Sequence, residues 1–140
     1  MSKKLILLEG IDGSGKTTYA SEMIKYSSWD NTINYVYFPK QESILDTIIT
    51  WFDLTFFVKK LPGITLIDRS IISTYVYHGL DKELLLNDML RSVDPKSAKI
   101  IYFSEVYKQE PGIDYGNLKE RYKEYLKVLE KDYEIIYADE

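Results

Sequence analysis

Apolar residues along the chain gather into short runs, separated by longer segments with the periodicity of helices. Five runs of strand length are predicted to form a sheet: Lys4–Leu8, Ile33–Phe38, Ile64–Ile67, Lys99–Phe103 and Tyr133–Tyr137. Four of them are almost continuously apolar, which is typical of parallel strands that are buried on both faces.

The segments between these runs predict helices over Gly15–Tyr26, Glu42–Lys60, Ser70–Tyr77, Lys82–Arg91 and Leu118–Lys131. The second segment has room for one helix or two. Asp81 is the expected N-cap of the fourth helix, and an aromatic stripe on the fifth is read as core packing. This alternation predicts an α/β fold with three layers: a five-stranded parallel sheet flanked by helices.

Composition narrows the class of protein. A chain of 140 residues is expected to form one domain, residues 1–140, and it has neither cysteine nor an apolar run long enough to cross a membrane. We therefore expect a cytoplasmic protein without a membrane partner. The net charge of -4 argues against binding to a nucleic acid polymer, which needs a basic surface.

A phosphate-binding motif follows the first predicted strand. The segment Gly10-Ile11-Asp12-Gly13-Ser14-Gly15-Lys16-Thr17 matches G-x-x-x-x-G-K-[ST] at every position and precedes a predicted helix. In this context the backbone N–H groups cradle phosphates, the lysine contacts the β- and γ-phosphates, and the Thr17 hydroxyl is a ligand for Mg²⁺. The motif predicts ATP as the phosphate donor.

A second polar cluster follows the third predicted strand, where Asp68 and Arg69 precede a helix. An aspartate at this edge of the sheet is suited to bind magnesium or to accept a proton, and a neighbouring guanidinium is suited to bind an acceptor phosphate. Ser73 and Tyr77 follow on the same predicted helical face. Asp12, inside the phosphate loop, is expected to accept a hydrogen bond from a sugar hydroxyl.

Together these segments resemble the thymidylate kinases among the P-loop nucleotide kinases. The residues that carry the resemblance are Glu9 to Thr18, the Gly63–Ser70 segment continuing to Tyr77, and the Phe38-Pro39 turn. The resemblance implies a P-loop kinase fold, Mg²⁺ as cofactor, transfer of phosphate from ATP to a nucleoside monophosphate such as dTMP, and a homodimer.

The resemblance also implies roles for individual residues. Catalysis would depend on Lys16, Asp68 and Arg69, with Lys108 as the candidate substitute for the family's catalytic arginine, and the metal would be held by Thr17 and Asp68. ATP would contact Gly13, Ser14, Gly15, Lys16, Thr17, Thr18, Ala138 and Asp139. The acceptor would contact Asp12, Phe38, Pro39, Lys40, Trp51, Phe52, Arg69, Ser73 and Tyr77.

The chain departs from the family at the positions that supply positive charge. The family places an arginine after its Phe-Pro turn, where this chain has Lys40 and Gln41, and a catalytic arginine in the lid or the phosphate loop. Here the loop position is Gly13. The expected lid, a reduced one at about residues 104–117, contains Lys108 as its only cation. The sequence therefore predicts a slow kinase, or one in which Lys108 replaces the arginine.

Two other functions remain open from the sequence. A deoxynucleoside kinase would use a bare hydroxyl as the acceptor, which the neighbouring Arg69 disfavours. A nucleotide-binding protein with little or no catalysis would agree with the shortened lid. A GTPase is disfavoured because the chain lacks an Asn-Lys-x-Asp segment.

Overall fold

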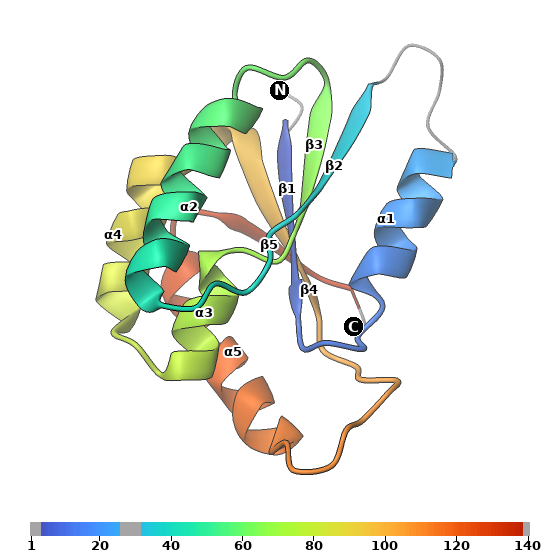
Figure 1. Cartoon of the computed structure of the whole chain (residues 1–140), viewed down its shortest axis with the longest axis vertical. Coiled ribbons are helices and arrows are strands. Elements are labelled where there is room, and N and C mark those ends of the chain that lie inside the picture. The colour runs from blue at the N-terminus through green and yellow to red at the C-terminus, as the bar shows by residue number, and fades with distance from the viewer. Residues whose placement is uncertain (1–3, 26–31, 139–140) are drawn as a thin grey trace.

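A parallel sheet forms the centre of the computed structural model, which describes residues 4–25 and 32–138. Within this part of the chain the sheet has five strands in the order β2-β3-β1-β4-β5. The strands are β1 (Leu5–Gly10), β2 (Ile33–Tyr37), β3 (Ile64–Asp68), β4 (Ala98–Phe103) and β5 (Glu134–Tyr137). All five predicted strands are confirmed, and their carboxyl ends point to one edge of the sheet (Figure 1).

The helices are α1 (Lys16–Lys25), α2 (Ile44–Val58), α3 (Ile71–His78), α4 (Lys82–Ser92) and α5 (Tyr115–Leu129), with a 3₁₀ helix at Pro95–Ser97. The segment that left room for two helices forms the single helix α2. Asp81 caps α4 as predicted, with its side chain accepting from the N–H groups of Glu83 and Leu84. The α5 helix begins earlier than predicted, because the Asp114 side chain accepts from Asn117 N–H and caps an additional turn.

Helices cover both faces of the sheet, which confirms the three layers (Figure 1). Alternate side chains of β1 separate the core into two parts: Ile6 and Leu8 pack with Ala20 of α1, while Leu5 and Leu7 belong to the larger part beneath α2 to α5. Side chains alternate between the two faces of a strand, so Glu9 points to the same face of the sheet as Leu5 and Leu7.

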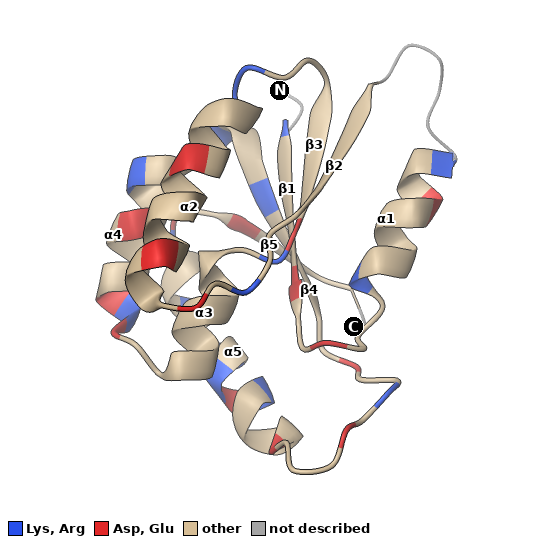
Figure 2. Ribbon diagram, in the orientation of Figure 1, with Lys and Arg blue, Asp and Glu red and all other residues tan. Residues whose placement is uncertain are grey.

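The surface carries charges of both signs. Figure 2 shows acidic and basic residues mixed along α4 and α5 rather than gathered into a basic stripe. None of the helices in residues 4–25 and 32–138 has the length and apolarity that crossing a bilayer requires.

Candidate active site

The phosphate loop connects β1 to α1 at the carboxyl edge of the sheet. Gly10 is tightly enclosed, because a Cβ atom there would lie 2.6 Å from the Phe103 carbonyl oxygen of β4. Gly13 has a φ of 87°, in the left-handed region that favours glycine. The Nζ atom of Lys16 reaches back into the loop and donates a 2.6 Å hydrogen bond to the Gly10 carbonyl oxygen.

Lys16 is a buried cation in a negative environment. Its side chain is 6% exposed and lies 3.9 Å from the Asp12 carboxylate. Burial lowers the pKa of Lys16 from its ordinary value, while the carboxylates of Glu9, Asp68 and Asp12 oppose that shift. An anionic phosphate in the loop would add to this compensation.

A cavity of about 400 Å³ opens above the loop and is lined by its residues from Asp12 to Thr18, with Tyr37, Asp68, Tyr107 and Lys108. The Ser14 hydroxyl is buried at its base, with no hydrogen-bond partner among the described residues. A buried polar atom without a partner is costly, and a phosphate oxygen would satisfy this one.

The segment between β4 and α5, residues 104–114, lies against the phosphate loop. The Tyr107 N–H donates a 2.9 Å hydrogen bond to the Gly13 carbonyl oxygen. A Cβ atom at Gly13 would meet the Lys108 carbonyl oxygen at 2.8 Å, so the main chain of this segment occupies the space of a side chain at position 13. The same contact brings Lys108 to the mouth of the cavity.

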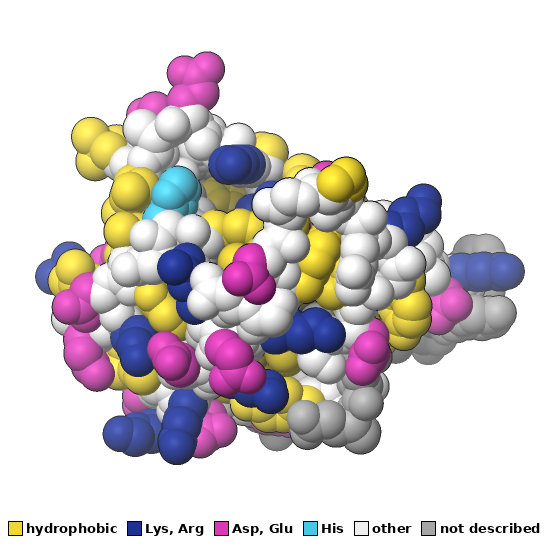
Figure 3. Space-filling view, turned by 90° about the horizontal axis from the view of Figure 1, so that it is seen from below, with side chains coloured by type: hydrophobic (Ala, Val, Ile, Leu, Met, Phe, Trp, Pro, Cys, Tyr) yellow, Lys and Arg dark blue, Asp and Glu magenta, His cyan; other side chains and the backbone are white. Residues whose placement is uncertain are grey.

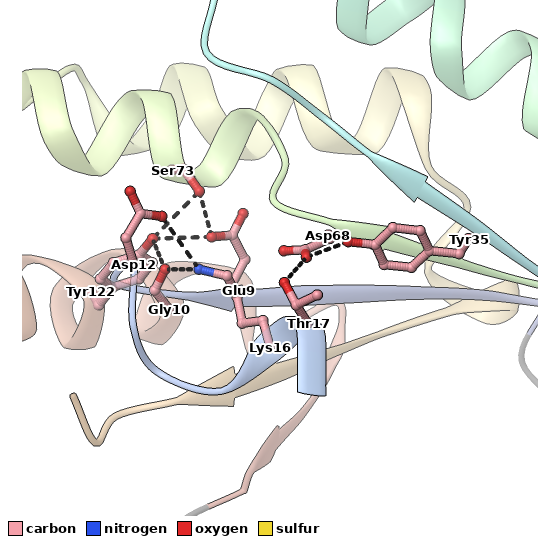
Figure 4. Close-up of polar contacts among 9 residues, drawn as sticks. All are labelled: Glu9, Gly10, Asp12, Lys16, Thr17, Tyr35, Asp68, Ser73 and Tyr122. Carbon is pink, nitrogen blue, oxygen red and sulfur yellow. Dashed lines mark hydrogen bonds and ion pairs between the residues drawn. The ribbon is translucent and has the colours of Figure 1, made fainter. Parts of the chain in front are cut away.

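Asp68 is the last residue of β3 and lines the same cavity as the phosphate loop. Its Oδ2 atom accepts hydrogen bonds from the Thr17 hydroxyl at 3.0 Å and the Tyr35 hydroxyl at 2.7 Å (Figure 4). Its Oδ1 atom is buried and has no partner among the described residues. Burial and the bond to Asp68 raise the pKa of Tyr35 to about 12, so its hydroxyl is a protonated donor at neutral pH.

Arg69 follows with a φ of 74°, an unusual backbone conformation for a residue with a side chain. This turn directs Asp68 and Arg69 toward different cavities. Burial acts to lower the pKa of Arg69, but Glu9, a hydrogen bond with Tyr37, and Asp12 raise it above its ordinary value. The guanidinium also lies 5.9 Å from the centre of the Tyr77 ring.

A buried carboxylate, Glu9, joins the phosphate loop to two helices. It is 0% exposed and accepts hydrogen bonds from Ser73 at 2.6 Å and from Tyr122 at 3.0 Å (Figure 4). It also accepts a hydrogen bond from Ser70. These hydroxyls come from α3, α5 and the N-cap of α3. They offset the cost of desolvating the charge. Burial, together with the neighbouring Glu9, raises the pKa of Tyr122.

Further cavities border the phosphate loop. One of about 80 Å³ is lined by residues that include Asp12, Lys40, Thr47, Arg69, Thr74 and Tyr77. Another of about 560 Å³ lies on the opposite side of the loop, with Tyr19, Glu22, Phe103, Tyr107 and Ala138 in its walls. Figure 3 views this end of the molecule and shows basic and acidic side chains interspersed around its hollows.

Solved structures share this architecture. The crystal structure of thymidylate kinase from Ehrlichia chaffeensis matches with a TM-score of 0.58 and 19% identity, covering 99% of this chain and 90% of that chain. The YorR protein of Bacillus subtilis, solved in complex with phosphorylated GDP, matches with a TM-score of 0.58 and 18% identity, covering 95% of this chain and 84% of its own. At this level of identity the likeness establishes the fold.

A sequence relative establishes more. No family model matches the chain. A protein of Acidianus bottle-shaped virus (isolate Italy/Pozzuoli), named "Putative thymidylate kinase", is 34% identical over 145 residues, and the alignment covers 94% of this chain and 92% of the relative.

The chain belongs to the thymidylate kinase family. Family membership and the P-loop kinase fold are therefore confirmed, and the resemblance stated from the sequence extends beyond the first half of the chain.

Most residues predicted for a thymidylate kinase site are brought together. Asp12, the loop residues to Thr18, Asp68 and Lys108 line one cavity, and Lys40, Arg69 and Tyr77 line the next, with Asp12 lining both. Ala138 borders the cavity beyond the loop, and Asp139 lies outside the described residues. Pro39 is exposed in the turn and Phe52 is half-buried on α2.

Two predicted acceptor residues, Trp51 and Phe38, are buried in the core and line neither of these cavities. The prediction for Trp51 is wrong: its side chain is 0% exposed, and its indole N–H donates to Ser92 at 2.9 Å. Phe38 is 2% exposed and packs edge-on against the Trp51 ring. Ser73 lines the cavity of Arg69, while its buried hydroxyl donates to Glu9.

Sequence reasoning missed four residues that hold the site: Glu9, Tyr122, Tyr35 and Tyr37. Glu9 precedes the motif directly, and a charged residue at the end of an otherwise apolar strand was the available signal. Tyr35 and Tyr37 alternate along β2, but their partners Asp68 and Arg69 are distant in the sequence.

Proposed function

We propose that this thymidylate kinase family member transfers the γ-phosphate of ATP to a deoxynucleoside monophosphate, converting dTMP to dTDP. The observation that carries the proposal is the arrangement of two cations in adjoining cavities. Lys16 lines the cavity of the phosphate loop, Arg69 lines the neighbouring one, and Asp12 lines both. Two phosphorylated ligands would thus meet at a shared wall.

The loop supplies the donor subsite. Backbone N–H groups and the unpartnered Ser14 hydroxyl would hold the phosphates, and Lys16 would turn from the Gly10 carbonyl to the β- and γ-phosphate oxygens. The adenine would lie in the cavity bordered by Ala138 and Tyr107. We propose Asp139 as a further contact to adenine.

Thr17 and Asp68 fit a magnesium site. Both present oxygen atoms, which Mg²⁺ prefers, and the Oδ1 atom of Asp68 is buried without a partner. Bound there, the ion would neutralise charge on the transferring phosphate. The Thr17 hydroxyl can offer its oxygen to the metal while it still donates its proton to Asp68 Oδ2.

The acceptor would lie in the cavity of Arg69. A guanidinium can bind a phosphate through two parallel hydrogen bonds, and the raised pKa of Arg69 keeps its charge fixed. Asp12, whose side chain is 77% exposed, would accept a hydrogen bond from the sugar hydroxyl, and Tyr77 would lie beside the sugar. Lys40, Pro39 and the half-buried Phe52 would complete the acceptor contacts.

Catalysis would then consist of positioning and charge neutralisation. An acceptor phosphate oxygen attacks the γ-phosphorus while the bond to the ADP oxygen breaks. Among the described residues that line the phosphate cavity, the cations are Lys16 and Lys108. We propose that segment 104–114 serves as a reduced lid and that Lys108 stabilises the transferring group in place of an arginine.

We also propose that the enzyme acts in the cytoplasm as a homodimer. The outer face of α2 carries Leu45, Ile49 and Phe56, which are 67%, 51% and 63% exposed and are spaced as one helical stripe. Apolar surface of this kind favours a partner. Sedimentation should give twice the chain mass, and Phe56→Glu should reduce it to the monomer.

A coupled assay tests the proposal. ATP and Mg²⁺ are supplied with dTMP, other deoxynucleoside monophosphates and thymidine, and product is identified by chromatography. Formation of dTDP from dTMP supports the proposal, and Lys16→Ala serves as the inactive control. Product from thymidine but not from dTMP would instead identify a deoxynucleoside kinase, and ATP binding without product would identify a nucleotide-binding protein.

A further inference from the structure

The edge strand β2 places two tyrosine side chains near Asp68, the last residue of β3, and Arg69, which follows it. Tyr35 and Tyr37 are two positions apart, so their side chains lie on the same face of the strand. The parallel register pairs Tyr35 with Leu66 and Tyr37 with Asp68. Both side chains are partly exposed, at 37% and 50%.

Tyr35 determines which oxygen of Asp68 remains available. The Oδ2 atom accepts from two protein hydroxyls, those of Tyr35 at 2.7 Å and Thr17 at 3.0 Å (Figure 4). The Oδ1 atom accepts from none of the described residues, although it is buried beside the phosphate cavity. Two donors on one oxygen fix the rotation of the carboxylate, and the other oxygen is thereby presented to the cavity.

Tyr37 makes the corresponding contact with Arg69. Its ring lines the phosphate cavity, and its side chain is among the groups that raise the pKa of Arg69. Tyr35 is thus associated with the acidic residue Asp68, and Tyr37 with the basic residue Arg69. The left-handed backbone at Arg69 separates these two side chains and gives each tyrosine a single target.

We propose that Tyr35 and Tyr37 are positioning residues: Tyr35 holds Asp68 for the magnesium-bearing phosphates of the donor, and Tyr37 holds Arg69 for the acceptor. This inference rests on the proposed function for the naming of the two ligands. Neither tyrosine transfers a proton. Each hydroxyl restricts a charged side chain that would otherwise sample several orientations.

Phenylalanine variants test the proposal, and each is the matched control of the other. Both keep the ring and remove one oxygen from a partly exposed side chain, and thermal unfolding checks that the fold is retained. Calorimetry measures the affinity for a non-hydrolysable ATP analogue with Mg²⁺ and with EDTA. A separate titration measures the affinity for dTMP.

For Tyr35→Phe we expect the affinity gained on adding Mg²⁺ to fall about fivefold, with affinity in EDTA and for dTMP unchanged. This is the size of one ordinary hydrogen bond, because Tyr35 acts on the metal only through Asp68. For Tyr37→Phe we expect dTMP affinity to fall about fivefold, with the Mg²⁺ response unchanged. Wild-type responses in both variants, or equal losses of both affinities in each, would overturn the inference. An inactive wild-type protein that still showed the Mg²⁺ effect of Tyr35 would instead contradict the proposed function.

Discussion

The hydroxyl of Tyr122 donates a 3.0 Å hydrogen bond to the carboxylate of Glu9, across 113 positions of the chain. This contact attaches α5 to the strand that leads into the phosphate loop. Ser70 and Ser73 attach α3 to the same carboxylate. The geometry of the loop therefore depends on helices from the second half of the chain.

Glu9→Ala should destabilise the protein by about 3 kcal/mol, since it leaves three buried hydroxyls without their acceptor. Tyr122→Phe removes one donor and keeps the charge, so it should cost about 1 kcal/mol. Urea denaturation measures both free energies of unfolding. Equal losses in the two variants would show that the carboxylate is not the centre of this network.

Arg69→Ala should raise the KM for dTMP by roughly 10- to 100-fold, because a charged hydrogen bond to phosphate contributes about 1.5–3 kcal/mol. The KM for ATP should change less than threefold. Arg69→Lys should recover only part of the loss, since an ammonium cannot form the paired contact. Arg91→Ala, at an exposed position of α4, is the control. Equal increases in both KM values would show that Arg69 does not belong to the acceptor subsite.

Lys108→Ala should lower kcat by about 10-fold or more with little change in either KM, if its charge is used mainly in the transition state. Lys123→Ala removes an exposed lysine that pairs with Glu120 on α5, and it should leave kcat unchanged. Steady-state kinetics of the wild-type protein and the two variants measures kcat and both KM values. An unaltered kcat in Lys108→Ala would show that the reaction does not use a cation from segment 104–114.

Stability should decline as the pH rises above about 10. Burial raises the pKa of Tyr122 and of Tyr133, whose hydroxyl donates to the Val93 carbonyl oxygen at 2.6 Å. The folded protein therefore keeps protons that the unfolded chain releases, so this contribution is complete below the unfolded pKa and is lost above it. Thermal unfolding between pH 8 and 11.5 measures the decline, which should be shallower in Tyr133→Phe. A stability independent of pH in this range would contradict the expectation.

The sequence predicted the sheet and its functional edge because apolar runs and the glycine motif are local signals. It placed the end of β1 at Leu8, whereas the strand continues through Glu9 and Gly10, which pair with Tyr102 and Phe103 of β4. In a sequence, a charged residue after an apolar run indicates the end of a buried strand. Here its charge is satisfied by hydroxyls from distant segments, which no local pattern reveals.

The aromatic residues of α2 illustrate the same limit within the site. Trp51 faces the core, while Phe56 and Phe57 are 63% and 57% exposed. The helix is apolar on more than one side, so its periodicity could not indicate which ring faces a ligand. Ser92 fixes the Trp51 orientation by accepting a hydrogen bond from its N–H; it belongs to α4 and was assigned no role from the sequence.

The close approach of the Lys108 carbonyl oxygen to Gly13 limits how this enzyme could evolve. Any larger residue at position 13 would push the neighbouring segment away from the loop, so an ancestor or descendant with an arginine there would need a differently folded connection. A faster descendant would more readily gain its guanidinium at position 108 itself. Directed evolution for turnover should accordingly recover Lys108→Arg well before any change of Gly13.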